Sequence, residues 1–204
     1  MATDLQPDRN AYSSVMEEIK LREKVIRSFV LGERDALFNV TTVETIVLQV
    51  RMVLELIPMA SLAAHKDLFN TASKKFRNHW HPGKILTELE ALNPDFFPVP
   101  IEEKPLDTEG IKAVLAESRK EALTREELVR IHGKCGGILH ASNPYNRKTD
   151  YDKVLKDVNL WMTKVRNLLN VHKIRLLDET QFHLVQMSAG ESGRVHMYMF
   201  QRVE

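Results

Sequence analysis

The sequence predicts a mainly α-helical protein, a bundle of five or six helices followed by a C-terminal β-hairpin. The longest apolar run lies at residues 41–65, and amphipathic segments with helical spacing stand before and after it. Strict alternation of apolar and polar residues is found only after residue 180. We therefore expect a helical domain over residues 1–175, with residues 176–204 packed on it as a hairpin in a single compact unit.

The central run is expected to form a buried helix. Thr41 with Glu44 three residues on has the pattern of a capping box, which predicts the first turn. Apolar side chains then point in nearly every direction around the helix, which is typical of a core element. Pro58 removes a backbone donor and is expected to kink the end, so the prediction covers Thr41–Ile57.

One narrow stripe of this helix is polar. Glu44, Arg51 and Glu55 fall on it at about 100° per residue, and Arg51 and Glu55 are four residues apart, which allows them to pair. The stripe is either the solvated edge of the helix or the wall of an internal cleft, since charges in a core must be paired or used. We expect Arg51 and Glu55 to pair and to meet the glycine-edged side of the helix that carries His140. These three residues form a candidate small-molecule binding site.

Composition restricts the class of protein. The 204 residues carry a formal net charge of +1, which gives no global attraction to nucleic acid or to an anionic membrane. A single cysteine, Cys135, fits a reducing compartment. The N-terminal residues contain no apolar segment of signal-peptide length, and charges interrupt the central run, so no membrane span is expected. The expectation is a cytoplasmic globular protein.

The remaining elements follow in chain order. Thr124 and Glu127 form a second capping-box pattern, and Gly190–Gly193 link the two alternating runs of the hairpin. The proline-rich segment 95–110 is expected to be irregular, either a lid, a partner-binding arm or a strap, with the strap favoured. The helices are expected at 9–31, 82–93, 110–121, from 124 to about 142, and at 149–174, with a further one between 66 and 81.

Three glycines, Gly133, Gly136 and Gly137, stand inside the helix that begins at Thr124. Each glycine in a helix interior lowers helix stability by about 1 kcal/mol relative to alanine, so their presence here calls for a structural or functional explanation. Close approach of another helix is the favoured reason, and close approach of a ligand is the alternative.

The same helix carries His132, Cys135 and His140. A histidine beside an apolar face is more often a hydrogen-bonded core residue than a catalyst, and this favours a core role for His132, whereas the two roles are balanced for His140. The position of Cys135 in the apolar arc favours an inert buried thiol over a nucleophile.

No metal or cofactor is expected. The spacing of the histidines and the cysteine matches no zinc motif, and the run His79-Trp80-His81 is more often a surface feature than a ligand set. Phosphate-binding loops, nucleophile elbows and dinucleotide fingerprints are missing from the sequence.

Four stretches, ETIVLQVRMVLELI, ALNPDFFPVPI, GKCGGILHASNPY and LLNVHKI, resemble a group of bacterial helical proteins without an assigned activity. The chain also resembles, more distantly, the HEPN superfamily of helical proteins from toxin–antitoxin and antiviral systems. Many HEPN proteins are metal-independent ribonucleases. Their motif is an arginine, usually followed by Asn, Asp or His, and then a histidine after four to six residues.

Two stretches fit this spacing. Arg166 is followed by Asn167, and His172 follows at the required distance; Arg125 and His132 also fit, but Glu126 stands in the second position. In a straight helix Arg166 and His172 lie about 120° apart, whereas Arg125 and His132 share a face. The resemblance implies that the histidine acts as acid and base and that the arginine stabilises phosphate charge.

The leading hypothesis is therefore a bacterial HEPN-like protein, a metal-independent ribonuclease in a defence or toxin system. The alternative is a non-enzymatic binding or assembly module that engages a partner chain through the 95–110 segment or the edge of the hairpin. RNA, a partner protein and a second copy in a homodimer are the candidate partners. A membrane is not among them.

Overall fold

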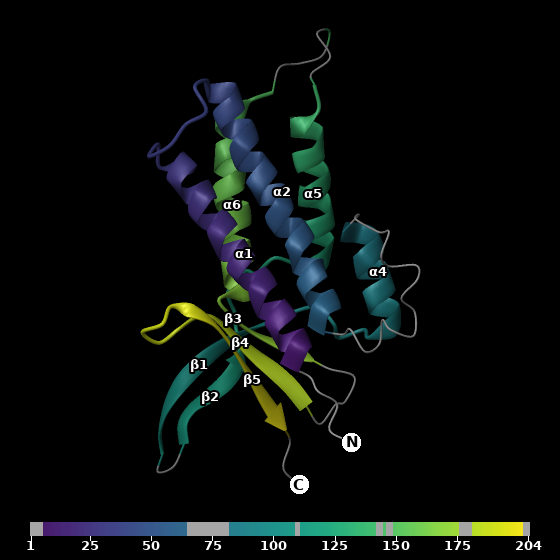
Figure 1. Cartoon of the computed structure of the whole chain (residues 1–204), viewed down its shortest axis with the longest axis vertical. Helices are drawn as coiled ribbons and strands as arrows, with labels where there is room; N and C mark the ends of the chain where they lie inside the picture. Colours follow the sequence, from purple (N-terminus) through teal and green to yellow (C-terminus); the bar gives the residue numbers. More distant parts are fainter. Residues whose placement is uncertain are drawn as a thin grey trace.

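The computed structural model describes residues 6–64, 82–108, 111–141, 145, 149–175 and 181–201. Within these residues five helices stand together at one end, and a five-stranded sheet lies at the other (Figure 1). The helices are α1 (Gln6–Val30), α2 (Asn39–Ala64), α4 (Pro82–Leu92), α5 (Arg125–Leu139) and α6 (Tyr151–Leu169). The strands are β1 (Val99–Thr108), β2 (Ile111–Glu117), β3 (Val171–Arg175), β4 (Gln181–Ala189) and β5 (Arg194–Gln201).

The fold is a mixed α/β fold, so the prediction of a helical bundle whose strands are confined to a C-terminal hairpin is wrong. Three segments account for the error. The 95–110 segment holds strand β1 where an irregular strap was expected, and the expected helix at 110–121 is strand β2. The helix expected to reach Ile174 ends at Leu169, and β3 follows at once.

Helix α2 is the core of the helical layer. Ten of its residues are buried, and they face α1, α4, α5 and α6. The helix begins at Asn39, two residues before the predicted start. The Thr41 hydroxyl donates to the carbonyl of Phe38 at 3.0 Å, so the predicted capping box at Thr41 is not formed. It also continues through Pro58 to Ala64.

Among the described residues, α2 is the one helix long and apolar enough to span a membrane. Half of its most apolar window is buried inside the protein. A core helix of a soluble protein has this pattern, and the structure is compatible with a soluble protein.

The sheet is antiparallel throughout, with the order β2-β1-β3-β4-β5. Alternate residues of β3 and β4 are buried toward the helices: His172 stands opposite Val185, and Ile174 stands opposite His183. The sheet therefore joins residues that precede the expected boundary at 175 with the hairpin that follows it.

The predicted C-terminal hairpin is present as β4 and β5. Gly190 and Gly193 in its link have φ values of +48° and +59°, a region in which a side chain would be strained. Helix α1 crosses this hairpin and fixes it, because Lys20 donates to the carbonyl of Gly193 at 2.6 Å and Glu17 accepts from the amide of Val195 at 2.7 Å.

Candidate functional site

His172 lies on β3 beneath α1, with no exposed surface. Its Nδ1 is 2.7 Å from the carbonyl of Leu169, and its Nε2 is 2.6 Å from the hydroxyl of Tyr12. A carbonyl only accepts, so Nδ1 carries the proton and Nε2 accepts from the tyrosine. Burial lowers the pKa of His172 to about 4.

Arg166 lies near the end of α6, on the surface of the protein. Its guanidinium pairs with Glu23 of α1 at 3.0 Å and donates to the hydroxyl of Thr163 at 3.0 Å. Both ring nitrogens of His172 are occupied by Tyr12 and Leu169. The structure therefore does not bring Arg166 and His172 into one site.

Arg125 and His132 also have separate partners. Arg125 forms ion pairs with Glu90 of α4 and with Glu126, whereas His132 forms a hydrogen bond with Glu55 of α2. The ion pairs neutralise the arginine, and the histidine is 6% exposed. The capping box that was predicted to begin this helix is present at Thr124 and Glu127.

Arg51 and Glu55 pair, as predicted, and they meet α5. The Arg51 Nε is 3.0 Å from Glu55 Oε1, and His132 Nε2 is 2.8 Å from the same oxygen. A Cβ on Gly136 would lie 3.3 Å from an Arg51 guanidinium nitrogen, so this glycine does face α2. Burial raises the pKa of the Glu55 carboxyl, but the hydrogen bonds from His132 and Arg51 outweigh burial and leave the pKa below its usual range.

His140 does not join this network among the described contacts. It caps the C-terminal end of α5 and is exposed, and its amide donates to the carbonyl of Gly136 at 3.2 Å. The histidine that meets Arg51 and Glu55 is His132, two turns earlier. The predicted trio of Arg51, Glu55 and His140 is thus replaced by Arg51, Glu55 and His132.

Of the other candidate residues, Cys135 is buried and unreactive, and the histidines of the run 79–81 lie outside the described residues. Cys135 is fully buried, and burial raises the pKa of its thiol to about 12, so the thiol stays protonated. His79, Trp80 and His81 fall outside the described residues. In the part of the chain that is described, no three histidine, cysteine or carboxylate side chains form a group that could hold a metal ion.

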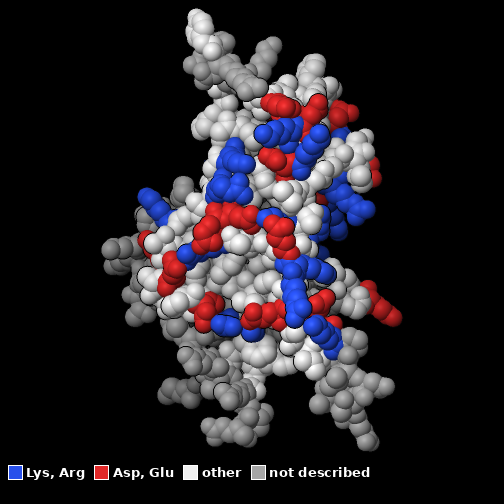
Figure 2. All heavy atoms as spheres, turned by 180° about the vertical axis from the view of Figure 1, so that it is seen from behind, with Lys and Arg blue, Asp and Glu red and all other residues white. Residues whose placement is uncertain are grey.

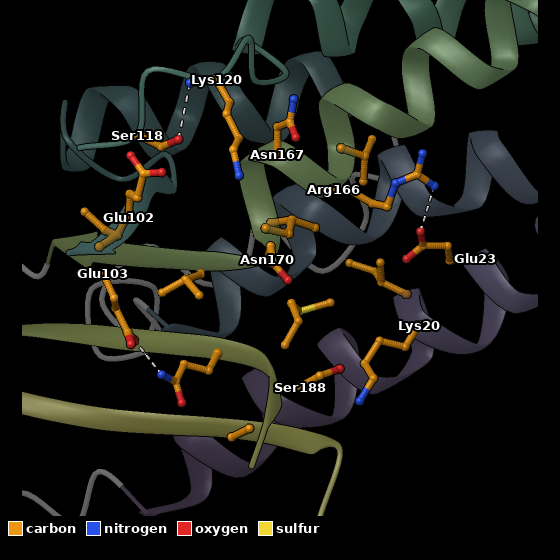
Figure 3. A pocket seen from close by; sticks show the side chains of 18 of the residues that line it. Lys20, Glu23, Glu102, Glu103, Ser118, Lys120, Arg166, Asn167, Asn170 and Ser188 are labelled. Atoms are coloured by element: carbon orange, nitrogen blue, oxygen red, sulfur yellow. Dashed lines mark hydrogen bonds and ion pairs between the residues drawn. The ribbon is translucent and has the colours of Figure 1, made fainter. Parts of the chain in front are cut away.

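A cavity of about 610 Å³ lies where the helical layer meets the sheet, and it is called the seam cavity below (Figure 3). Its walls come from α1, β1, the end of α6, the link that precedes α5, and the end of β4. The charged residues on its rim are Lys20, Lys120, Arg166, Glu23, Glu102 and Glu103. The apolar residues that line it are Ile19, Ile101, Val165, Leu169, Val171, Met187 and Ala189.

The three cations of the rim differ in their contacts. Arg166 turns to Glu23 (Figure 3). The ammonium of Lys20 is held by Glu17 at 3.1 Å and by the carbonyl of Gly193. Lys120 is exposed and has no carboxylate partner among the described residues. Figure 3 shows its side chain reaching toward the cavity beside Asn167. Lys120 is therefore the cation most available to a ligand.

Two of the rim carboxylates are engaged and one is open. Glu23 pairs with Arg166, and Glu103 accepts from the amide of Gln186 at 2.6 Å. Glu102 has no hydrogen-bond or ion-pair partner among the described residues. Asn170 and Ser188 add exposed amide and hydroxyl groups. The cavity thus offers a free cation and a free carboxylate above an apolar floor.

Sequence reasoning found Arg166 and Asn167 but missed the rest of this rim. Lys120 and Glu102 stand in segments expected to be a helix and a strap, and no local motif marks either of them. Lys120 and Glu102 meet because β1 and β2 pair with each other, with Glu102 opposite Ala116. The pairing of β1 with β3, a long-range contact, places them beside the end of α6. No protein-family model matches the chain, and no curated protein and no solved structure is significantly similar to it.

Proposed function

We propose that the protein is a binding protein, and that the seam cavity takes a nucleotide unit, either a free nucleotide or the terminal nucleotide of an RNA. The observation that carries this proposal is the placement of Lys120 and Arg166 above an apolar floor in a cavity of about 610 Å³. Cavities that hold small molecules commonly measure about 300–1,000 Å³ and combine an apolar lining with a few polar groups.

The phosphate of the nucleotide is expected to bind Lys120. The ammonium of this lysine has no carboxylate partner among the described residues. The oxygens of a phosphate would give it an anionic hydrogen-bond acceptor. Arg166 would add a second donor without leaving Glu23, since a guanidinium has five N–H groups and the contacts with Glu23 and Thr163 leave some of them available.

The base and the sugar are expected to use the rest of the cavity. A flat base would lie on the apolar side chains of Val165, Leu169 and Met187. The Glu102 carboxylate only accepts hydrogen bonds, so it is suited to an amino group of a base or to the hydroxyls of a ribose. A ligand with an anionic end, a ring and hydrogen-bond donors engages all three parts of the cavity at once.

The charge balance favours one phosphate over a long polyanion. The rim carries three cations and three carboxylates, so it has no net charge to attract successive phosphates. On the face seen from behind, acidic and basic side chains are intermingled around a pale central area (Figure 2). An RNA would therefore be held by one end, with weak dependence on salt.

The proposal keeps RNA as a candidate partner but assigns no cleavage to the predicted arginine–histidine pairs. His172 offers no nitrogen to a ligand in the seam cavity, because both of its nitrogens are bonded inside the protein. Similarity to HEPN proteins, a bacterial defence or toxin role and a cytoplasmic location stay predictions. They agree with a protein that binds nucleotides inside the cell.

Calorimetric titration of the full chain with nucleoside 5′-monophosphates tests the proposal. The expected result is saturable one-to-one binding that weakens at least tenfold in Lys120→Ala and does not change in Lys24→Ala, a matched exposed lysine on α1. Nucleosides without phosphate, free amino acids and short RNAs with and without a 5′-phosphate form the comparison arms.

The arms separate the outcomes. Binding of the mononucleotide alone identifies a free nucleotide as the ligand, and binding of only the 5′-phosphorylated RNA identifies an RNA end. Binding of amino acids in preference to nucleotides, or equal binding by wild type and Lys120→Ala, would overturn the proposal.

A further inference from the structure

Glu102 and Lys120 lie on the same wall of the seam cavity, and hydrogen bonds fix the segments that carry them (Figure 3). Glu102 stands two residues after Pro100 on β1. The carbonyl of Pro100 accepts from the amide of Ser118 at 2.9 Å, and the hydroxyl of Ser118 accepts from the amide of Lys120 at 3.3 Å. The free carboxylate and the free cation of the cavity therefore come from adjoining segments.

These two groups form no ion pair with each other among the described contacts, so a space remains between the ammonium and the carboxylate. A phosphate bound to Lys120 places the sugar of a nucleotide next to it, because the sugar is the group bonded to the phosphate. The base lies farther away, on the apolar residues that α6 and β4 contribute to the cavity. The part of the nucleotide beside Glu102 is thus the sugar.

We propose that the seam cavity is selective for ribonucleotides, and that Glu102 is the residue that distinguishes a ribose from a 2′-deoxyribose. The inference rests on the proposed function and names the sugar that the cavity accepts. A carboxylate has two oxygens that only accept, and the neighbouring 2′- and 3′-hydroxyls of a ribose supply two donors. An acidic residue binds the ribose 2′-hydroxyl in the same way in NAD-binding folds. A deoxyribose leaves one of these hydrogen bonds unmade.

The other carboxylates of the rim already have partners. Glu103 accepts from the amide of Gln186 at 2.6 Å, and Glu23 pairs with Arg166 at 3.0 Å. Among the described residues, Glu102 is therefore the carboxylate of the rim that a sugar can use. A hydrogen bond to a charged acceptor changes a binding constant by about tenfold or more, which sets the expected selectivity.

Calorimetric titration with paired nucleotides tests the inference. Each of the common ribonucleoside 5′-monophosphates is compared with its 2′-deoxy counterpart, so that only one hydroxyl changes. The wild type is expected to bind the ribonucleotide of each pair about tenfold more tightly. Lys120→Ala is expected to weaken both members of a pair equally, because the phosphate is common to them.

Glu102→Gln separates the sugar contact from the effect of charge. Loss of this carboxylate also removes its repulsion of the phosphate, so the measurement is the ratio of the two affinities and not either affinity alone. The ratio is expected to fall from about tenfold to below about twofold. Glu117→Gln removes the same charge from the neighbouring strand β2, outside the lining of the cavity, and is expected to keep the ratio.

The outcomes are distinct from those that test the proposed function. Equal binding of the two sugars by the wild type, in titrations that still depend on Lys120, overturns the sugar selectivity and leaves nucleotide binding standing. Selectivity among the bases that Glu102→Gln abolishes assigns Glu102 to the base and overturns the inference as well. Absence of binding by every nucleotide overturns the proposed function together with the inference.

Discussion

The hydroxyl of Tyr12 donates a hydrogen bond to Nε2 of His172, 2.6 Å away, and so joins the first helix to the middle of the sheet. Both residues are fully buried. Burial raises the pKa of Tyr12, so the phenol remains a donor, and burial lowers the pKa of His172, so the imidazole remains an acceptor. The histidine of the predicted catalytic motif is thus a structural residue that holds the two layers together.

Acid is therefore expected to destabilise the protein through His172. The pKa of a free histidine is about 6.5, and that of His172 is about 4 in the folded state. Between these pH values the unfolded chain binds the proton and the folded chain does not, so stability falls as the pH drops from about 6.5 to 4. The loss is on the order of 3 kcal/mol, measurable by urea unfolding across this range.

His172→Gln is the matched control for this effect. Glutamine retains hydrogen-bonding groups at the site but does not titrate, so the variant is expected to be less stable at neutral pH and to show a flatter slope between pH 6.5 and 4. An unchanged slope in His172→Gln would show that other groups cause the acid sensitivity.

Glu55 is expected to stabilise the contact between α2 and α5. Its Oε1 accepts from both Arg51 and His132, so Glu55→Ala removes two hydrogen bonds and leaves a buried imidazole N–H without this acceptor. The expected loss in the free energy of unfolding is about 2–3 kcal/mol, whereas Glu55→Gln, which keeps an accepting oxygen, should lose about half as much. Chemical denaturation of both variants and of Arg51→Ala measures these differences; equal losses in the two Glu55 variants would contradict the account.

The glycines of α5 are expected to respond differently to alanine. Gly133 and Gly137 face open space, so alanine at either position should raise the free energy of unfolding by about 0.5–1 kcal/mol through helix propensity alone. Gly136 faces the Arg51 guanidinium at 3.3 Å, and the gain there should be offset by displacement of that group. Thermal and urea unfolding distinguish the positions, and destabilisation by Gly133→Ala would reveal a contact with a ligand or a partner.

Cleavage of RNA is expected not to depend on the predicted motif pairs. Arg166→Ala removes a surface ion pair with Glu23 and should leave the fold intact, so it tests the role of the arginine without unfolding the protein. In a metal-free assay, Arg166→Ala and His132→Ala are expected to give the same level of RNA cleavage as the wild type. A hundredfold loss of genuine cleavage in Arg166→Ala would restore the ribonuclease hypothesis.

Helices with strong signals were predictable from the sequence, and strands in ambiguous segments were not. Helix α2 has apolar residues on all sides, and α5 begins with a capping box at Thr124. Each signal lies within a single helix, so a local sequence pattern identifies it. Strand β2, with the sequence IKAVLAE, contains good helix formers and becomes a strand through its pairing with β1. Strand β1 was not predicted because it contains Pro100 and Pro105, and proline is uncommon inside strands.

The contacts of the predicted site residues and the lining of the seam cavity were predictable only in part. The pairing of Arg51 with Glu55 follows from helical spacing, and it was found. The sequence of β3, residues 171–175, alternates in a way that is compatible with a strand. It is also compatible with a continuation of the preceding helix, so the sequence did not decide between the two. Lys120 and Glu102 could not be placed in a common site, because their proximity depends on the pairing of β1 with β2, two segments that were not expected to be strands.

The most direct test of nucleotide binding in the seam cavity is a titration of methyl-labelled methionines observed by NMR. Met187 lines the cavity, whereas Met16 and Met162 are buried in the core away from its lining and serve as internal controls. Addition of a nucleoside 5′-monophosphate is expected to shift the Met187 methyl signal saturably, to leave the Met16 and Met162 signals in place, and to lose this effect in Lys120→Ala. A Met187 signal that does not move at millimolar nucleotide would contradict the proposed function.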